Sequence, residues 1–199
     1  MSSLNIMTNI SRCKWCEKDS LYIKYHDNEW GTPIHDEQKL FECLILETFQ
    51  AGLSWITVLR KRENFRKAFD NFDYKKVALY DEDKIQELLQ DAGIIRNKLK
   101  VRATVSNAQA FLKVQKEFGS FDKYIWSFVD WKPIQNKWKT TKELPASTEL
   151  SDLLSKDLKK RGFKFVGSTV VYAHMQATGM VNDHTIDCYR YDELSTKTI

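Results

Sequence analysis

Glycine and proline are scarce in this chain, which holds 7 Gly and 3 Pro among 199 residues. Together they make up about 5% of the chain, against roughly 12% in average proteins. Sheet proteins with many tight turns place these residues at their corners, so the scarcity argues against such folds. No convincing run of alternating apolar and polar residues is present either. The sequence therefore predicts an all-α fold.

Cysteine and long apolar runs are also limited. Four cysteines are too few for a disulfide framework in a chain of this length. The N-terminus lacks the early cationic region and the apolar stretch of a signal peptide. The longest uncharged stretch, 165–182, contains threonine, histidine, glutamine and asparagine and is too polar for a lipid span. We therefore expect a cytoplasmic protein with no membrane partner.

No charge is in large excess, since 31 Lys and Arg face 27 Asp and Glu, for a net charge of +4. The distribution is more informative. Five cations and no acid lie between Arg96 and Lys113, and Lys159, Lys160, Arg161 and Lys164 form a second cluster on a glycine-containing turn. Two such patches suit a phosphate backbone. They also suit an ordinary solvated face, and charge alone leaves both interpretations open.

The spacing of apolar residues and the capping residues predict the helices. The expected helical segments are 36–52, 54–69, short helices capped by Asp73 and Asp81, 97–118, one opening at Ser120, 147–161 and 168–178. Residues 1–11 read as a flexible N-terminal arm, and 130–146 as a long connection. We expect one helical domain over 12–190, with room for two lobes and a pocket between them, and a C-terminal tail over 191–199.

Possible metal ligands lie near both ends of the chain. His184 and Cys188 are four residues apart, so on a helical turn they would present two ligands of one tetrahedral zinc. Cys13 and Cys16 have a spacing that zinc sites favour, and His26 follows. Cys13, Cys16 and His26 are thus three candidates for the two remaining ligand positions. The resulting structural site would join the two ends of the chain. The alternative is that these are free thiols and surface imidazoles.

One acid, Glu47, falls at the edge of the apolar face of the helix expected over 36–52. Burial without a partner would disfavour its charged form, so a deeply placed carboxylate would need hydrogen bonds or a cationic ligand. The simpler expectation is a boundary residue partly in water. Flat rings crowd around it in sequence and, with one acid, suit a planar, electron-poor group such as an alkylated base. They are Trp15, Tyr22, Tyr25, Trp30 and Trp55.

Two turns could contact nucleic acid. Leu53 is the large apolar residue in the turn 50–54, where an exposed leucine could act as a wedge between base pairs; alternatively it folds back as a helix-capping contact. The segment 161–168 carries two glycines five apart before a helix, so its free N–H groups could bind a phosphate. Gly167 is followed by Ser168 and no lysine, which argues against nucleotide hydrolysis.

Several strings together carry a family resemblance: YHDNEWG (25–31), QAGLSWITVLRKREN (50–64), DAGIIR (91–96), WSFV (126–129), KKRGFKFVGST (159–169) and NDH (182–184). They occur in order over nearly the whole chain. On these motifs the sequence resembles the bacterial 3-methyladenine DNA glycosylase I family. The resemblance implies a helix-hairpin-helix fold and hydrolytic release of 3-methyladenine from alkylated double-stranded DNA, without an AP-lyase step, by a monomer in the bacterial cytoplasm.

The resemblance also implies roles for individual residues. It places one structural zinc per chain on Cys13, His26, His184 and Cys188, which leaves Cys16 surplus or able to displace His26. It places the base-contacting acid on Glu47, as the catalytic residue. Its substrate-binding rings fall on Tyr22, Tyr25, Trp55, Trp15 and Trp30. Its DNA-binding positions fall on Gly52, Leu53, Gly162, Lys164, Gly167 and Ser168.

Two other classes of function stay open at this point. A zinc-stabilised module that binds DNA lesions without catalysis would use the same rings and cations. A structural or protein-interaction domain would show no salt-dependent affinity for DNA. Many helix-hairpin-helix relatives carry a catalytic aspartate, and Asp183 is a candidate for that role. We interpret it instead as a neighbour of the metal ligand His184.

Overall fold

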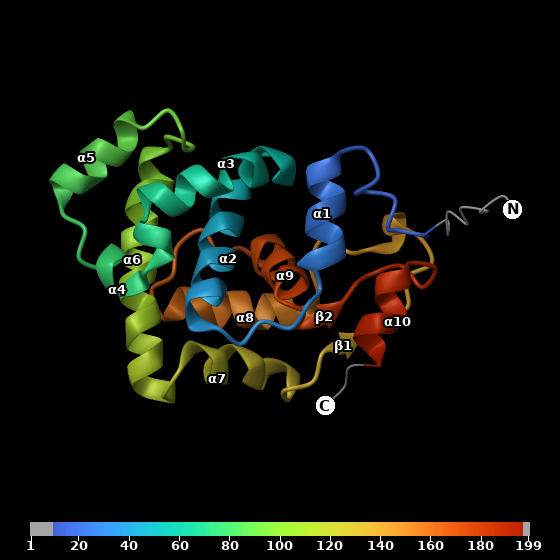
Figure 1. Cartoon of the computed structure of the whole chain (residues 1–199). Coiled ribbons are helices and arrows are strands. Elements are labelled where there is room, and N and C mark those ends of the chain that lie inside the picture. The colour runs from blue at the N-terminus through green and yellow to red at the C-terminus, as the bar shows by residue number, and fades with distance from the viewer. Residues whose placement is uncertain (1–9, 197–199) are drawn as a thin grey trace, which may run out of the picture.

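The computed structural model describes residues 10–196, and helices account for most of this part of the chain (Figure 1). The helices are α1 Ser20–Asn28, α2 Glu37–Gln50, α3 Trp55–Ala68, α4 Tyr74–Val77, α5 Glu82–Gln90, α6 Lys98–Phe118, α7 Phe121–Trp126, α8 Glu149–Lys160, α9 Ser168–Ala177 and α10 Tyr189–Ser195. Short 3-10 turns lie at Asp70–Phe72, Ser127–Val129 and Thr141–Glu143. The predicted all-helical character is therefore confirmed.

Local capping explains where the predicted helices begin and end. The Asp36 side chain accepts a hydrogen bond from the Lys39 amide at the start of α2, and Asn97 and Ser120 cap α6 and α7 in the same way. Gly119 ends α6 with a φ of +86°, a left-handed conformation that glycine adopts without strain. These helices begin and end within a few residues of the predicted positions.

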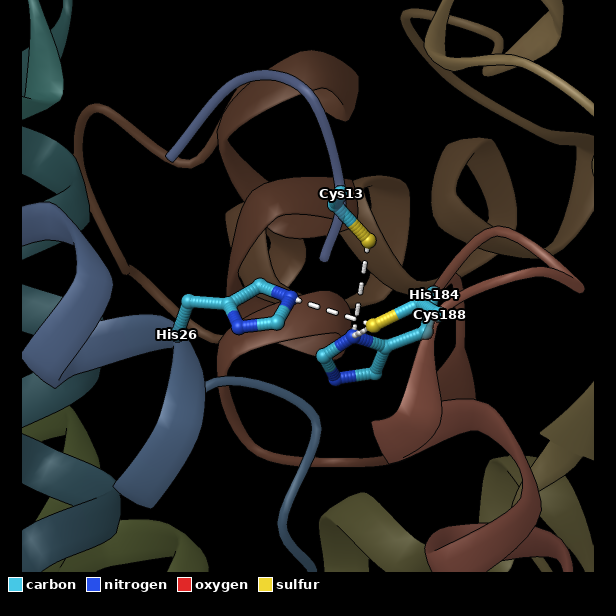
Figure 2. Close-up of side chains that lie close together, drawn as sticks. All are labelled: Cys13, His26, His184 and Cys188. Atoms are coloured by element: carbon cyan, nitrogen blue, oxygen red, sulfur yellow. Dashed lines mark hydrogen bonds between the residues drawn. The ribbon is translucent and has the colours of Figure 1, made fainter. Parts of the chain in front are cut away.

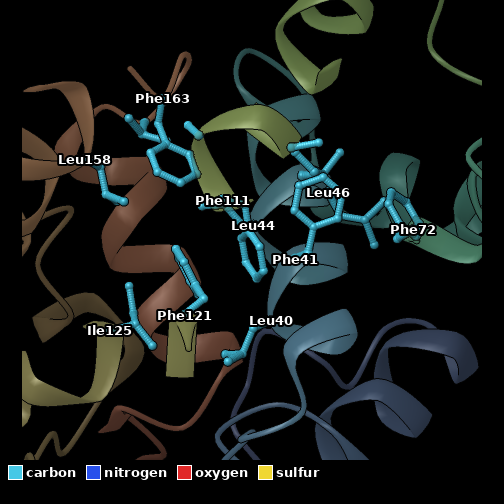
Figure 3. Packing of buried hydrophobic residues seen from close by; sticks show 14 of the residues in the cluster. Leu40, Phe41, Leu44, Leu46, Phe72, Phe111, Phe121, Ile125, Leu158 and Phe163 are labelled. Carbon is cyan, nitrogen blue, oxygen red and sulfur yellow. The ribbon is translucent and has the colours of Figure 1, made fainter. Parts of the chain in front are cut away.

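The apolar core lies between α2, α6, α7 and α8 (Figure 3). Leu40, Phe41 and Leu44 recur along one side of α2 and are fully buried, as their helical spacing predicts. Phe111 of α6 stacks on Phe121 of α7 with ring centroids 4.2 Å apart. Because these contacts enclose α2 on several sides, the residues on its inner face have rigid surroundings.

Several elements differ from the sequence expectation. Helices α1 and α10 fall where no helix was predicted, and α10 occupies much of the expected tail 191–199. Two-residue strands β1 Ile134–Gln135 and β2 Val181–Asn182 pair in parallel, which ties the connection 130–146 to the segment after α9. Strands this short leave no pattern in a sequence. Most of the expected N-terminal arm, 1–9, lies outside the described residues.

None of the helices within residues 10–196 is both long enough and apolar enough to cross a membrane. The segment 165–182, which is the longest uncharged stretch, instead contributes α9. This helix packs against α2 and α8 in the interior of the molecule.

Candidate functional site

A cavity of about 220 Å³ opens between α1, α2, α3 and α9. Its walls contain all six pocket residues proposed from the sequence. They are Trp15, Tyr22, Tyr25, Trp30, Glu47 and Trp55. Residues from four different segments thus meet around one space that is large enough for a purine base.

Glu47 projects inward from α2 and is only 4% exposed. Its Oε2 atom has no hydrogen-bond partner among the described residues. Burial raises the pKa of this carboxyl from 4.5 to about 8. The simpler expectation of a partly solvated boundary residue is therefore wrong, because the neighbouring helices close over the edge of the α2 apolar face.

A second, larger cavity shares Tyr25, Glu47 and Trp55 with the first, and Arg62 is one of the cations in its wall. The guanidinium of Arg62 donates to both carboxylate oxygens of Glu29, with the longer N–O distance at 2.9 Å. Arg62 is thus already paired. Glu47 consequently has no ionic partner among the described residues, and its carboxyl is free to contact a ligand.

The rings of the cavity hold one another in place. Trp15 meets Tyr22 and Trp30 edge to face, with centroid distances of 5.4 and 5.1 Å. Tyr25 and Trp55 lie 5.5 Å apart on the side of Glu47. The hydroxyl of Tyr22 accepts a hydrogen bond of 3.0 Å from the Ile56 amide at the start of α3. The indole N–H of Trp55 is buried without an acceptor among the described residues.

Four possible metal ligands converge beside this cavity (Figure 2). They are Cys13, His26, His184 and Cys188, all buried, and their ligand atoms lie within 4.8 Å of one another. The Nδ1 atom of His184 is 3.5 Å from the Sγ atoms of both cysteines, and Nε2 of His26 is 3.4 Å from Sγ of Cys188. Zinc bonds of about 2.3 Å to sulfur and 2.0–2.1 Å to nitrogen place tetrahedral ligand pairs about 3.5 Å apart. These distances therefore fit a metal ion.

Hydrogen bonds outside the cluster orient both imidazoles toward it. Nδ1 of His26 lies 2.8 Å from Oδ1 of Asp27, and Nε2 of His184 lies 3.1 Å from the carbonyl oxygen of Trp30. Each of these outer nitrogens faces an acceptor and so carries the proton, which leaves the lone pair of the other nitrogen facing the cluster. Hydrogen bonding from Cys13, His184 and His26 lowers the pKa of the Cys188 thiol, which favours the thiolate that binds metals.

Cys16 is buried but does not join the cluster. Its Sγ atom donates to the carbonyl oxygen of Cys13 at 3.1 Å. His26 therefore occupies the place for which Cys16 was the alternative. His184 and Cys188 also do not share a helical turn, since both precede α10, and the turn that closes with Cys188 N to Thr185 O at 2.8 Å brings them together.

The turn between α2 and α3 carries Leu53 outward. Its side chain is 42% exposed, so the alternative of a leucine folded back as a cap is wrong. The Leu53 amide donates to the Gln50 carbonyl, and Gly52 has a φ of +82°. An L-residue at Gly52 would be strained in this conformation. The turn is thus a compact projection with an apolar tip.

The segment between α8 and α9 forms a hairpin loop at 161–167. Gly162 has a φ of +97°, and Gly167 stands directly before α9. The space next to the α-carbon of each glycine is open to at least 4 Å. Ser168, in the first turn of α9, shares a hydrogen bond of 2.8 Å with Ser151 of α8. No side chain among the described residues caps the start of α9, and the N–H groups of its first turn have no intrahelical acceptor.

Comparison with known proteins agrees with these features. Residues 15–191 match the family Methyladenine glycosylase. The chain belongs to this family. It is 53% identical over 182 residues to DNA-3-methyladenine glycosylase 1 of Escherichia coli strain K12, a match that covers 92% of this chain and 97% of that protein. DNA-3-methyladenine glycosylase of Haemophilus influenzae is 51% identical, with 89% and 96% covered.

Solved structures place the chain in the same family. The fold matches a crystal structure of 3-methyladenine DNA glycosylase I with a TM-score of 0.87 and 51% identity, covering 90% of this chain and 98% of that one. A structure of the Staphylococcus aureus enzyme, described as the structural basis of 3-methyladenine recognition, also gives a TM-score of 0.87, at 38% identity, with 89% and 95% covered.

In this methyladenine glycosylase, four cavity residues escaped the sequence analysis: Gln50, Leu144, Ala173 and Gln176. Gln50 was detectable in principle, because it lies three residues after Glu47 on the same helical face. The other three come from distant segments and left no local signal.

Asp183 has a different place from the cavity residues. It accepts hydrogen bonds from Asn136, Trp138, Tyr172 and Gln176, at distances of 2.6–2.8 Å, and is 1% exposed. Its two oxygens are thus fully engaged by side chains of the 130–146 connection and of α9. Asp183 anchors Gln176 in the cavity wall and ties these segments together.

Proposed function

We propose that this methyladenine glycosylase removes 3-methyladenine from alkylated double-stranded DNA by hydrolysing the N-glycosidic bond, without an AP-lyase step. The observation that supports this proposal best is the buried, unpaired carboxyl of Glu47 inside a cavity walled by aromatic rings. A base methylated at N3 is cationic while it is still attached to the sugar. Such a base supplies a positively charged partner for the Glu47 carboxylate. It also supplies a flat surface that fits between the rings.

Glu47 acts mainly by recognising the methylated base and by stabilising its positive charge. The cationic base leaves as a neutral molecule, so its bond to the sugar is weak and little acid catalysis is needed. The carboxylate accepts a hydrogen bond from the exocyclic amine and favours the cation over neutral adenine. Stacking against Trp55 adds about 1–3 kcal/mol per base. Tyr22, Tyr25, Trp15 and Trp30 complete the binding surface.

The base must leave the duplex before it reaches this cavity, at a cost of a few kcal/mol. We assign this step to the turn with Gly52 and Leu53, whose exposed leucine fills the place of the displaced base. Gly162, Lys164, Gly167 and Ser168 bind the phosphate backbone through the open hairpin before α9, in the manner of a helix-hairpin-helix protein. Glu47 lies in the last turn of α2, and Leu53 lies in the turn that follows this helix. The residue that opens the duplex is therefore close in the chain to the residue that binds the displaced base.

We also propose one structural zinc ion per chain, held by Cys13, His26, His184 and Cys188. Two cysteines and two histidines are a common ligand set of closed, tetrahedral structural zinc sites. When bound, the ion supplies a crosslink between the two ends of a single domain, 12–190, that works as a monomer. It takes no part in bond cleavage, because all four ligand positions belong to the protein.

Base release from methylated DNA tests the function. Duplex DNA treated with a methylating agent is incubated with the wild-type protein, with Glu47→Gln and with the control Glu63→Gln, whose carboxyl is on the exposed side of α3. We expect free 3-methyladenine with the wild type and the control, and a drop of about 100-fold or more with Glu47→Gln. Tight binding of methylated DNA without released base would instead establish a lesion-binding module. Full activity of Glu47→Gln would remove this residue from the mechanism.

A further inference from the structure

Two of the buried polar side chains of helix α6, Lys100 and Asn107, hydrogen-bond to the loops that we assign to DNA. Lys100 is 6% exposed and Asn107 is fully buried. They are seven residues apart, which is about two helical turns or roughly 10.5 Å along one face. Neither lies in the wall of the base cavity. Both instead donate hydrogen bonds to the backbone of the loops that we assign to DNA.

Lys100 holds the end of α2, at Phe49 and at Ala51, which lies two residues before Leu53. Its Nζ atom donates to the carbonyl oxygens of Phe49 and Ala51, at 2.9 and 2.7 Å. No acid pairs with this ammonium among the described residues. Water can satisfy the carbonyls at an exposed helix end, so a buried cation is not needed for that purpose. What the ammonium adds is a fixed direction for the chain as it leaves α2.

Asn107 holds the hairpin loop in a corresponding way. Its Nδ2 atom donates to the carbonyl oxygen of Lys164 at 3.1 Å, and its Oδ1 atom accepts from the amide of Lys164 at 2.7 Å. Both ends of one amide are therefore bound to a single backbone position. The next residue, Phe165, has a φ of +57°, which is strained for an aromatic residue and needs such support.

We infer that Lys100 and Asn107 are positioning residues that keep the leucine turn and the phosphate-binding hairpin at a fixed spacing on α6. A rigid spacing means that the hairpin, once bound to the phosphate backbone, holds the leucine at the base pair to be opened, so binding to the backbone contributes to opening the duplex. The inference rests on the proposed function of the two loops. It adds that their register is set by α6, which itself touches neither the base nor the cavity.

A comparison of paired and unpaired substrates tests the role of Lys100. Lys100→Met keeps the length of the side chain and removes its hydrogen bonds, and Lys116→Met, exposed on the last turn of α6, is the control. Released 3-methyladenine is measured from methylated duplex DNA and from the same strand without its complement. We expect kcat/KM of Lys100→Met to fall about tenfold on the duplex and less than about twofold on the single strand. An equal loss on both substrates, or no loss on the duplex, would overturn the inference.

A double-mutant cycle separates positioning from a general structural role. In a Leu53→Ala background the turn has no wedge to position, so Lys100→Met should lower duplex excision by less than about twofold more. A further tenfold loss would mean that Lys100 acts independently of Leu53. If Lys100→Met does not fold, Lys100→Gln, which keeps an NH2 donor group on a shorter side chain, is judged by the same two criteria.

Asn107→Leu tests the other half of the inference. The hairpin contacts DNA before opening, so this change should raise KM for the duplex about tenfold and leave kcat within about twofold. Binding of free 3-methyladenine, followed by tryptophan fluorescence, should be unchanged in both variants. A loss of that binding, or a fall in kcat without a change in KM, would refute the assignment. An inactive wild type would refute the proposed function itself, which makes the two failures distinguishable.

Discussion

Replacing Glu47 by glutamine should make the protein more stable while it removes activity. Burial raises the pKa of this carboxyl from 4.5 to about 8, so the folded state binds its proton more tightly than the unfolded state does. The stabilising contribution of that proton is complete below pH 4.5 and is lost as the pH rises toward 8. At pH 7 the loss amounts to about 3 kcal/mol. Glutamine has the same shape and no charge, and it avoids this loss.

Urea unfolding of wild type, Glu47→Gln and the control Glu63→Gln at pH 5, 6, 7 and 8 measures this effect. The difference in unfolding free energy between Glu47→Gln and wild type should grow from about 1 kcal/mol at pH 5 to about 3 kcal/mol at pH 7. Wild type and Glu47→Gln are identical at every position except 47, so the difference isolates Glu47. A variant that unfolds at the same urea concentration as wild type at every pH would show that the carboxyl is solvated or paired, and the reasoning about its charge would fail.

Three further predictions concern other parts of the molecule. Asp27→Asn should weaken zinc binding about 10- to 100-fold, measured by competition with a chromophoric chelator, because Asp27 orients His26; unchanged affinity would contradict this role. Leu53→Ala should lower duplex excision about tenfold and change the unfolding free energy by less than about 0.5 kcal/mol, because the side chain is exposed. A large loss of stability would indicate a packing role instead. Burial lowers the pKa of His174 to about 4, so acidification from pH 6.5 to 4 should lower the unfolding free energy by about 3 kcal/mol, and His174→Leu should remove this part of the slope. Equal slopes in both proteins would refute it.

The long helices could be predicted because their boundaries are encoded locally. Asp36, Asn97 and Ser120 cap helices in the structure through their own side chains, and a short stretch of sequence is enough to recognise them. Helix α1 was missed although Asp19 caps it in the same way, because it spans only nine residues and buries only Tyr25 and His26. Contacts with the Cys/His cluster and with α3 stabilise α1, and such contacts are not visible in a local pattern.

The residues that form the site could be predicted from the sequence, but their arrangement in space could not. Rings and an acid close together in sequence suggested a pocket, and the family resemblance assigned each of them. The burial of Glu47 could not be predicted, because it depends on α3 and α9 closing over the edge of α2. The helical-turn expectation for His184 and Cys188 was wrong for a similar reason: β2 pairing with β1 sets the path of the chain just before His184.

The cavity is built from two parts whose stability has different origins. Glu47 and Trp55 belong to α2 and α3, which the apolar core holds. Trp30 belongs to the part held by the Cys/His cluster, since its carbonyl oxygen bonds to His184 and its ring lies 4.6 Å from the same imidazole. If the proposed zinc is bound, its loss would therefore free one wall of the cavity and leave the other in place. Water would then reach Glu47, its pKa would fall toward 4.5, and the carboxylate would lose its advantage for a cationic base. A structural ion that touches no substrate would in this way set the selectivity of the site.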